Sequence, residues 1–274
     1  MARLRKLLSR PPSVWNWSTL LRLLEHYPQG HQRTLAQEYA LNHLKNWPDS
    51  FRELHELNPQ HPGWPLATSI RLHECELSDE GFVQLQKASH LTTVTLVEGS
   101  LAALDILRGL PHLRHLRCLR LVNAWDEEAD LLNFETFRDF PPLLSLELHS
   151  DIAVHSLTGL ESLASLRQLH LHNLASVESL QPLSALRHVQ TLSLGHADEV
   201  QDWSPLSTLP VLTSLSLQGL HGHWSEMTGW SALPGLQELS LCRCAALDAS
   251  GLETLPSLSS VTIRHCPLLE AKEG

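Results

Sequence analysis

The sequence predicts an α/β solenoid, with a curved parallel sheet on its concave face, short helices and 3₁₀ turns on its convex face, and a helical cap at the N-terminus. A six-residue pattern with apolar residues at its first, fourth and sixth positions recurs nine times in 274 residues. Its last two apolar positions flank a polar one, as in a strand with one buried face. Residues 1–65 lack this pattern and space their apolar side chains three and four apart, which favours helices.

The N-terminal segment is predicted to hold three short helices. They cover SVWNWSTLLRLLEHY at 13–27, RTLAQEYALNHLKNW at 33–47 and PDSFRELHEL at 48–57, and Pro28, Gly30 and Pro48 separate them. A stack of repeats needs its first apolar face covered, so residues 1–65 are interpreted as a cap and residues 66–274 as the repeat domain. A separate docking or effector domain is the alternative for the first segment.

The repeat units follow one another every 22 to 27 residues, and one unit alone cannot bury its apolar face. They are ATSIRL from Ala67, LTTVTL from Leu91, LRCLRL from Leu116, LLSLEL from Leu143, LRQLHL from Leu166, VQTLSL from Val189, LTSLSL from Leu212, LQELSL from Leu236 and LSSVTI from Leu258. The segments between them are short, so one-turn or two-turn helices and 3₁₀ pieces are expected. Only EEADLLNFETFRDF, at 127–140, is predicted to form a helix of three turns or more.

These units resemble leucine-rich repeats. LHECELSDEGFVQL and LCRCAALDASGLETL are similar to the cysteine-containing repeats of F-box substrate receptors and related bacterial proteins, whereas VESLQPLSAL and VQDWSPLSTL are similar to the short repeats of internalins and phosphatase regulatory subunits. The resemblance implies a bacterial-type cytoplasmic protein that binds other proteins. It also implies an inward-turned residue after each strand, at Cys75, Gly99, Ala124, Asp151, Leu174, Ala197, Leu220, Cys244 and Cys266.

Composition argues against several classes of function. The formal net charge of −10 disfavours a general nucleic-acid binder, and no apolar run is long enough for a transmembrane helix. Five cysteines without a CxxC pair indicate free thiols and a cytoplasmic location. Because GxGxxG, P-loop and GxSxG motifs are absent from the sequence, neither an enzyme nor a bound cofactor is predicted.

The polar residues beside the apolar strand positions should line the concave face. Reading them across the repeats predicts a surface that binds a protein partner, with regulation or targeting as the finer form of this hypothesis. The candidate partner-binding residues are Arg71, His73, Arg120, Glu147, His149, His170, His172, His196, Gln218, Arg243 and Arg264.

Four of the chain's 18 histidines, at 149, 170, 172 and 196, should share one patch with Glu147. The alternative function is therefore a histidine-rich metal-binding protein, because imidazoles and a carboxylate suit zinc. A flat strand surface does not converge ligands on one point, so a polar recognition patch is preferred and no metal ligand is assigned. An acidic partner is expected to bind more tightly as the pH falls from about 7.5 to 6. The chain is expected to be a monomer, or a weak dimer through its last strand near 261–263.

Overall fold

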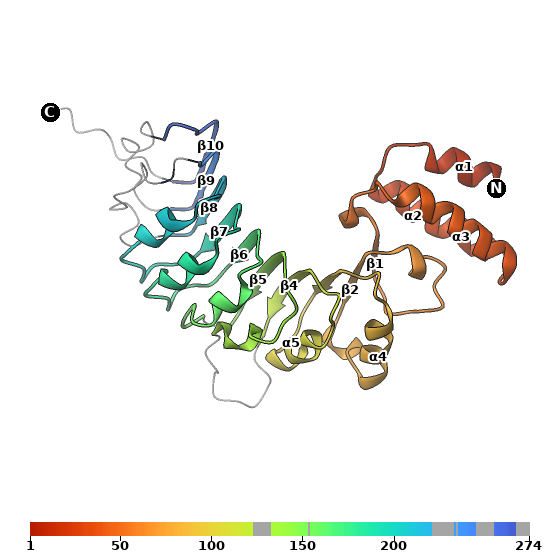
Figure 1. The fold of residues 1–274 in the computed structure, drawn as a ribbon, viewed down its shortest axis with the longest axis horizontal. Helices are drawn as coiled ribbons and strands as arrows, with labels where there is room; N and C mark the ends of the chain where they lie inside the picture. Colours follow the sequence, from red (N-terminus) through yellow and green to blue (C-terminus); the bar gives the residue numbers. More distant parts are fainter. Residues whose placement is uncertain (123–132, 153, 221–232, 234, 245–254, 267–274) are drawn as a thin grey trace.

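The computed structural model describes residues 1–122, 133–152, 154–220, 233, 235–244 and 255–266. Its centre is a ten-stranded sheet in which each strand pairs in parallel with the next along the chain. Figure 1 shows this sheet as a curved row that runs from the N-terminal helices to the C-terminal end. The strands are β1 (Glu53–Leu54), β2 (Ser69–Leu72), β3 (Thr93–Leu96), β4 (His115–Leu121), β5 (Ser145–Ser150), β6 (Gln168–Leu171), β7 (Thr191–Gly195), β8 (Ser214–Gln218), β9 (Glu238–Cys242) and β10 (Ser260–Arg264).

Short helices connect the strands of the repeats, as the lengths of the segments between strands predict, and the first three α-helices precede the sheet. The α-helices are α1 (Ala2–Leu8), α2 (Val14–Glu25), α3 (His31–Leu44), α4 (Asp79–Lys87) and α5 (Leu101–Arg108). The 3₁₀ helices are η1 (Asp49–Phe51), η2 (Trp64–Leu66), η3 (Glu74–Glu76), η4 (Phe134–Phe137), η5 (Leu160–Leu163), η6 (Gln181–Ala185) and η7 (Ser204–Thr208). The predicted solenoid is therefore confirmed.

The apolar positions of the repeats form the core. Buried leucines from successive strands are in register, as in Leu146, Leu169 and Leu192, and each is fully shielded from solvent. Leucines of α1, α2 and α3 belong to the same continuous hydrophobic cluster as the repeat leucines. This continuity supports the proposal that the N-terminal helices are a cap, because an independent domain has a core of its own.

Two predicted helices differ from the structure. The segment 48–57 forms η1 followed by β1, and β1 pairs with β2 as the first strand of the sheet. Trp17 of α2 fixes this strand, since its indole Nε1 donates to the carbonyl oxygen of Glu53 at 2.9 Å. In the segment 127–140, residues 127–132 lie outside the described residues, and the described remainder is the single 3₁₀ turn η4 rather than a longer helix.

The third repeat is displaced by three residues from its predicted alignment. Leu116 and Cys118 are the buried partners of Leu146 and Leu148, so this unit is LRHLRC from Leu113 instead of LRCLRL from Leu116. Both readings satisfy the apolar spacing, and a buried cysteine replaces the last leucine. Burial raises the pKa of the Cys118 thiol to about 12, so the thiol remains protonated in the core.

Left-handed residues mark where the later strands turn inward. Asn173, His196, Gly219, Arg243 and His265 all have φ between 54° and 66°. The residue after each of the first two, Leu174 and Ala197, is buried, in agreement with the predicted inward turn. This conformation costs an L-residue energy, and asparagine tolerates it better than most.

The cysteine positions follow this prediction only in part. Cys244 is buried, and its thiol donates to the carbonyl oxygen of Leu217 in the neighbouring repeat at 3.6 Å. The predicted inward turn of Cys75 is wrong, because η3 places this residue at the surface. Asp151 is likewise exposed rather than turned inward, and Ala124 lies outside the described residues. All five cysteines are free.

Candidate interaction surface on the concave face

The central strands β4, β5 and β6 bring a group of polar side chains together on the concave face. Strand register places Arg117 beside Glu147, and Glu147 beside His170. Their neighbours along each strand, Leu146, Leu148, Leu169 and Leu171, are buried, so the alternation of the strand turns the polar residues outward. We call Arg117, Glu147, His149, His170 and His172 the histidine patch.

A two-pronged ion pair holds the first part of the histidine patch. Arg117 Nε donates to Glu147 Oε2 at 2.6 Å, and Arg117 Nη2 donates to Glu147 Oε1 at 3.3 Å. His149 Nε2 lies 3.1 Å from the same Oε1. Although burial pushes the pKa of Glu147 up, the hydrogen bonds and charge of Arg117 and the contact with His149 hold it below its usual value. The carboxylate is therefore ionised at neutral pH.

The two imidazoles of His149 and His172 form a stack between neighbouring strands. Their ring centroids are 4.1 Å apart and their planes differ by 13°. Burial, with the nearby His149 and His196, lowers the pKa of His172 to about 4, and burial also lowers the pKa of His170. The ring of His172 is therefore neutral at pH 6 to 7.5, so the expected gain of charge over that range is wrong for this histidine.

Glycines of the following repeats accommodate these rings. A Cβ added at Gly195 would lie 2.9 Å from His172 Nδ1, and one added at Gly219 would lie 2.6 Å from His196 Cε1. His172 therefore packs over Gly195, and His196 packs over Gly219 one repeat further on. The alternation of the strands predicts that these histidines lie on the polar face. It does not predict that each ring packs against a glycine of the next repeat.

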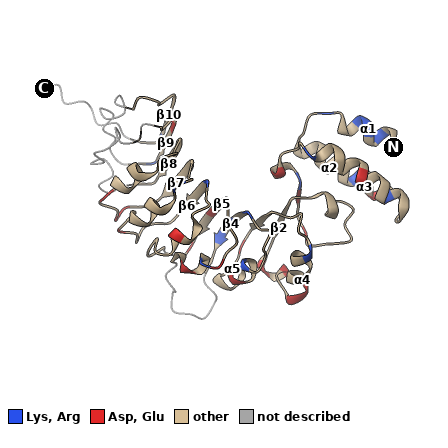
Figure 2. Cartoon of the chain, viewed as in Figure 1, with Lys and Arg blue, Asp and Glu red and all other residues tan. Residues whose placement is uncertain are grey.

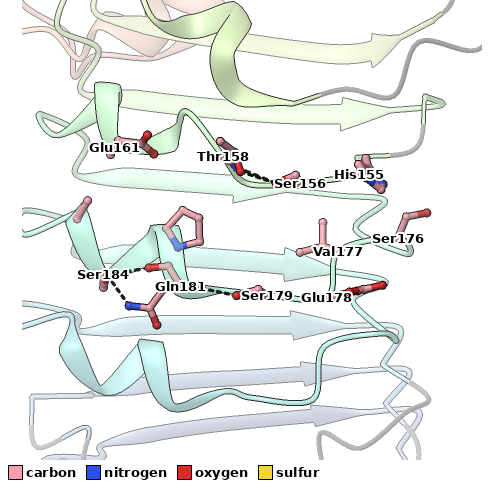
Figure 3. Close-up of a pocket in the computed structure, with 12 residues that line it drawn as sticks. His155, Ser156, Thr158, Glu161, Ser176, Val177, Glu178, Ser179, Gln181 and Ser184 are labelled. Atoms are coloured by element: carbon pink, nitrogen blue, oxygen red, sulfur yellow. Dashed lines mark hydrogen bonds between the residues drawn. The ribbon is translucent and has the colours of Figure 1, made fainter.

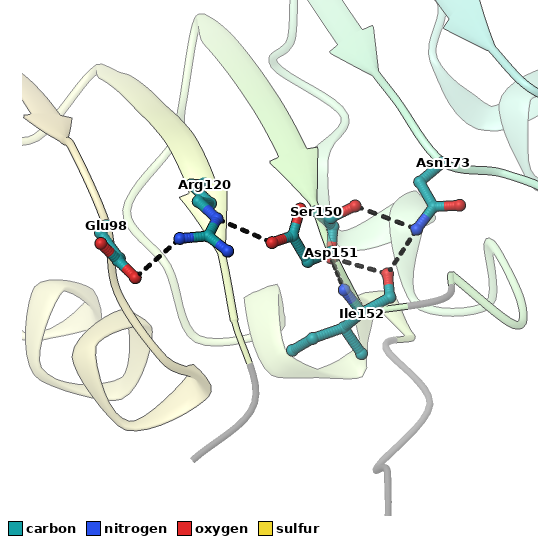
Figure 4. A network of polar contacts seen from close by, with 6 residues as sticks. All are labelled: Glu98, Arg120, Ser150, Asp151, Ile152 and Asn173. Carbon is teal, nitrogen blue, oxygen red and sulfur yellow. Dashed lines mark hydrogen bonds and ion pairs between the residues drawn. The ribbon is translucent and has the colours of Figure 1, made fainter. Parts of the chain in front are cut away.

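Arg120 occupies a different place from the one predicted. It lies beyond a register shift in β4, where its guanidinium bridges Glu98 at 3.1 Å and Asp151 at 2.7 Å (Figure 4). Arg117, and not Arg120, lies beside Glu147. The alternative alignment, with Cys118 accepted as a core residue, would have found Arg117 from the sequence.

The other candidate residues are distributed toward the two ends of the sheet. Arg71 pairs with Glu53 of β1 at 3.2 Å, and His73 is exposed just after β2. Gln218 lies at the end of β8, whereas Arg243 and Arg264 are exposed at or just after the ends of β9 and β10. The structure therefore gathers only the central candidates into one patch. On the strands between the histidine patch and the C-terminal end, the residues in register with His170 are uncharged. They are Ser193, Ser216, Ser240 and Thr262.

The geometry of the histidine patch does not favour the metal-binding alternative. Stacked rings point their nitrogens along two parallel planes, whereas zinc needs ligands that converge tetrahedrally. Within the described ranges, no three or more His, Cys, Asp or Glu side chains are placed to hold a metal ion.

A hollow lies on the flank of the solenoid, away from the strand surface. It has a volume of about 820 Å³ and lies along the loops that lead into η5 and η6 (Figure 3). Its polar side chains bond largely among themselves, since Ser156 Oγ lies 2.7 Å from Thr158 Oγ1 and Ser184 Oγ donates to the Gln181 carbonyl oxygen at 2.7 Å. This flank provides matched control positions for the concave face.

Comparisons with known proteins support the architecture. Neither the protein-family models nor the curated protein sequences give a match. Among solved structures, an internalin (InlF) of Listeria monocytogenes aligns over 95% of this chain and 71% of its own, with a TM-score of 0.51 and 17% identity. Internalin C2 of the same organism aligns over 68% and 77%, with a TM-score of 0.49 and 20% identity. The leucine-rich repeat protein LegL7 of Legionella pneumophila aligns over 77% and 90%, with a TM-score of 0.40 and 18% identity.

None of the helices that the structure describes is both long and apolar enough to cross a bilayer. Together, the parallel sheet, the short convex helices and the likeness to the internalin InlF show that this chain has the leucine-rich repeat solenoid fold.

Proposed function

We propose that this protein is a non-catalytic interaction module that binds a protein partner on its concave face, with the histidine patch at the centre of the contact. The observation that carries this proposal is the fixed geometry of the patch. Arg117 and Glu147 hold each other through two hydrogen bonds, and His149 is held by Glu147 and by stacking on His172. Side chains that are already ordered lose little conformational entropy on binding.

The chemistry of the patch suits the side chains of a folded partner. Arginine is enriched among the residues that dominate protein interfaces. The rings of His170 and His172 offer both apolar faces and hydrogen-bonding nitrogens, and burial lowers the pKa of each. The half-buried hydroxyls of Ser216, Ser240 and Thr262 extend the surface with further donors and acceptors. We further propose a regulatory or targeting role. We place this role in the cytoplasm, a location that the five free cysteines support.

Site-specific photo-crosslinking tests this proposal. A photoreactive amino acid placed at position 170 or 216 is expected to capture a discrete protein partner in cells that express the full chain. The matched probes at positions 161 and 178, on the flank, are expected not to capture that protein. Capture from the flank and not from the concave face would contradict the proposal. Elemental analysis of untagged protein separates the metal alternative, because stoichiometric zinc would support it.

A further inference from the structure

The N-terminal helices carry a charge opposite to that of the rest of the molecule. Residues 1–24 contain Arg3, Arg5, Lys6, Arg10 and Arg22 and no acidic residue, a net charge of +5. Because the net charge of the whole chain is −10, residues 25–274 carry a net charge of −15. Figure 2 shows the blue positions on α1 at the extreme N-terminal end of the molecule. Charges further away than about 8 Å are largely screened at physiological salt, so the acidic repeats leave this end cationic.

The basic side chains of α1 are exposed, and the guanidinium of Arg5 also lies over the Tyr39 ring, 5.8 Å from its centroid. Leu4, Leu7 and Leu8 face inward, and this places Arg3, Arg5 and Lys6 on the exposed side of the same helix. Among the described residues, none of the five cations of 1–24 forms an ion pair with an acidic side chain. On the concave face, by contrast, Arg117 and Arg120 are both paired with carboxylates.

Exposed apolar side chains lie beside these charges. The first turn of α2 presents Val14 and Trp15, which are 57% and 61% exposed. The guanidinium of Arg10 lies over the Trp15 ring, 5.9 Å from its centroid, so this cation and this apolar side chain form one surface. The first acidic residue along the chain, Glu25, is at the opposite end of α2.

We propose that this surface, Arg3, Arg5, Lys6, Arg10, Val14 and Trp15, docks the protein on an anionic lipid bilayer. Cations attract acidic headgroups, and a tryptophan prefers the boundary between headgroups and acyl chains. Val14 discriminates against nucleic acid as the partner, because an aliphatic side chain gains from an apolar phase that phosphates and base edges do not offer. The docking is peripheral, and it leaves the concave face open for its own partner.

Vesicle sedimentation with the full chain tests this proposal. The protein is expected to bind vesicles of phosphatidylcholine with 30% phosphatidylglycerol and not vesicles of phosphatidylcholine alone, and added salt should release it. Each cation near an acidic surface contributes about fivefold to binding, so the variant R3Q/R5Q/K6Q/R10Q should lose on the order of 100-fold or more. Removal of the apolar part in V14S/W15S should cost roughly tenfold without a change of charge.

The matched control has the same net charge as R3Q/R5Q/K6Q/R10Q, because it removes four other exposed cations. The variant K87Q/R138Q/R167Q/R187Q is expected to bind acidic vesicles within about threefold of the unmodified chain, because these residues lie along the repeats. An equal loss in this control would overturn the proposal, as would tighter binding of the unmodified chain to polyuridylate or polyglutamate than to the acidic vesicles. The salt titration uses the unmodified chain and so does not depend on how any variant folds.

Discussion

The imidazole of His172 lies parallel to that of His149 on the neighbouring strand, 4.1 Å away, and packs over Gly195 on its other side. Leucine positions two residues apart set this geometry, because they fix which side of each strand faces the core. The histidines are therefore the polar side of a repeat whose apolar side is leucine. Their partial burial against each other gives the surface a dependence on pH.

Acid is expected to destabilise the fold through His172. Its pKa of about 4 in the folded chain is below the ordinary value near 6.5, so the unfolded state binds a proton first as pH falls. The stabilisation is complete above pH 6.5 and is lost as pH falls toward 4. After allowance for solvent screening it amounts to about 1 kcal/mol. Thermal unfolding between pH 7 and 4 should show a smaller acid loss in His172→Gln than in the control His188→Gln, and equal losses would contradict this account.

The pair of Arg117 and Glu147 is expected to be coupled energetically. Chemical unfolding of Arg117→Gln and of Glu147→Gln should each show a loss of about 1 kcal/mol, and the double variant should lose less than the sum. Arg120→Gln is the control, because Arg120, Glu98 and Asp151 are all more than half exposed to solvent. Strict additivity of the two changes would show that the ion pair is not a unit.

Gly195 and Gly219 are expected to tolerate substitution unequally. Gly195→Ala displaces the ring of His172, and Gly219→Ala adds backbone strain at φ 63° to a clash with His196. We expect Gly219→Ala to lower the free energy of unfolding by about 1–2 kcal/mol and Gly195→Ala by less. Gly235→Ala is the control, since its added Cβ would meet Leu212 only at 3.4 Å. A loss in Gly235→Ala as large as that in Gly219→Ala, measured by urea unfolding, argues against the assignment.

The last strand is expected to support weak self-association. Val261 and Ile263 of β10 are 43% and 38% exposed, and β10 ends the order of the described strands. Light scattering should show a monomer at low concentration and growing mass at high concentration. Val261→Lys should suppress the growth, because a charge on an edge strand opposes pairing. Mass that is independent of concentration in the unmodified chain would exclude pairing through β10.

The sequence predicted the repeat architecture well because leucine spacing reports burial directly. It failed where two spacings fit equally. LRHLRC and LRCLRL overlap in the third repeat, and only pairing with Leu146 and Leu148 of β5 decides between them. With LRHLRC as the repeat unit, Arg117 rather than Arg120 is the residue that lies beside Glu147.

The candidate surface was predictable in its location but less so in its chemistry. Alternation identified His149, His170 and His172 as exposed neighbours. Burial is the main cause of the lowered pKa of His170 and of His172, and the alternation of the strand does not predict how deeply each ring is buried. Similarly, Cys75 follows its strand as Cys244 does, yet the bond from the backbone N–H of His73 to Glu76 starts a 3₁₀ turn that carries it outward.

Calorimetric titration of the captured partner into three forms of the full chain tests the central claim most directly. The patch variant R117Q/H149Q/H172Q is expected to keep a cooperative fold and to bind at least about tenfold more weakly than the unmodified chain. The variant E161Q/E178Q, which changes two residues of the flank, is expected to bind as the unmodified chain does. An unchanged Kd in the patch variant, together with weaker binding in the flank variant, would contradict the assignment of the concave face as the interaction surface.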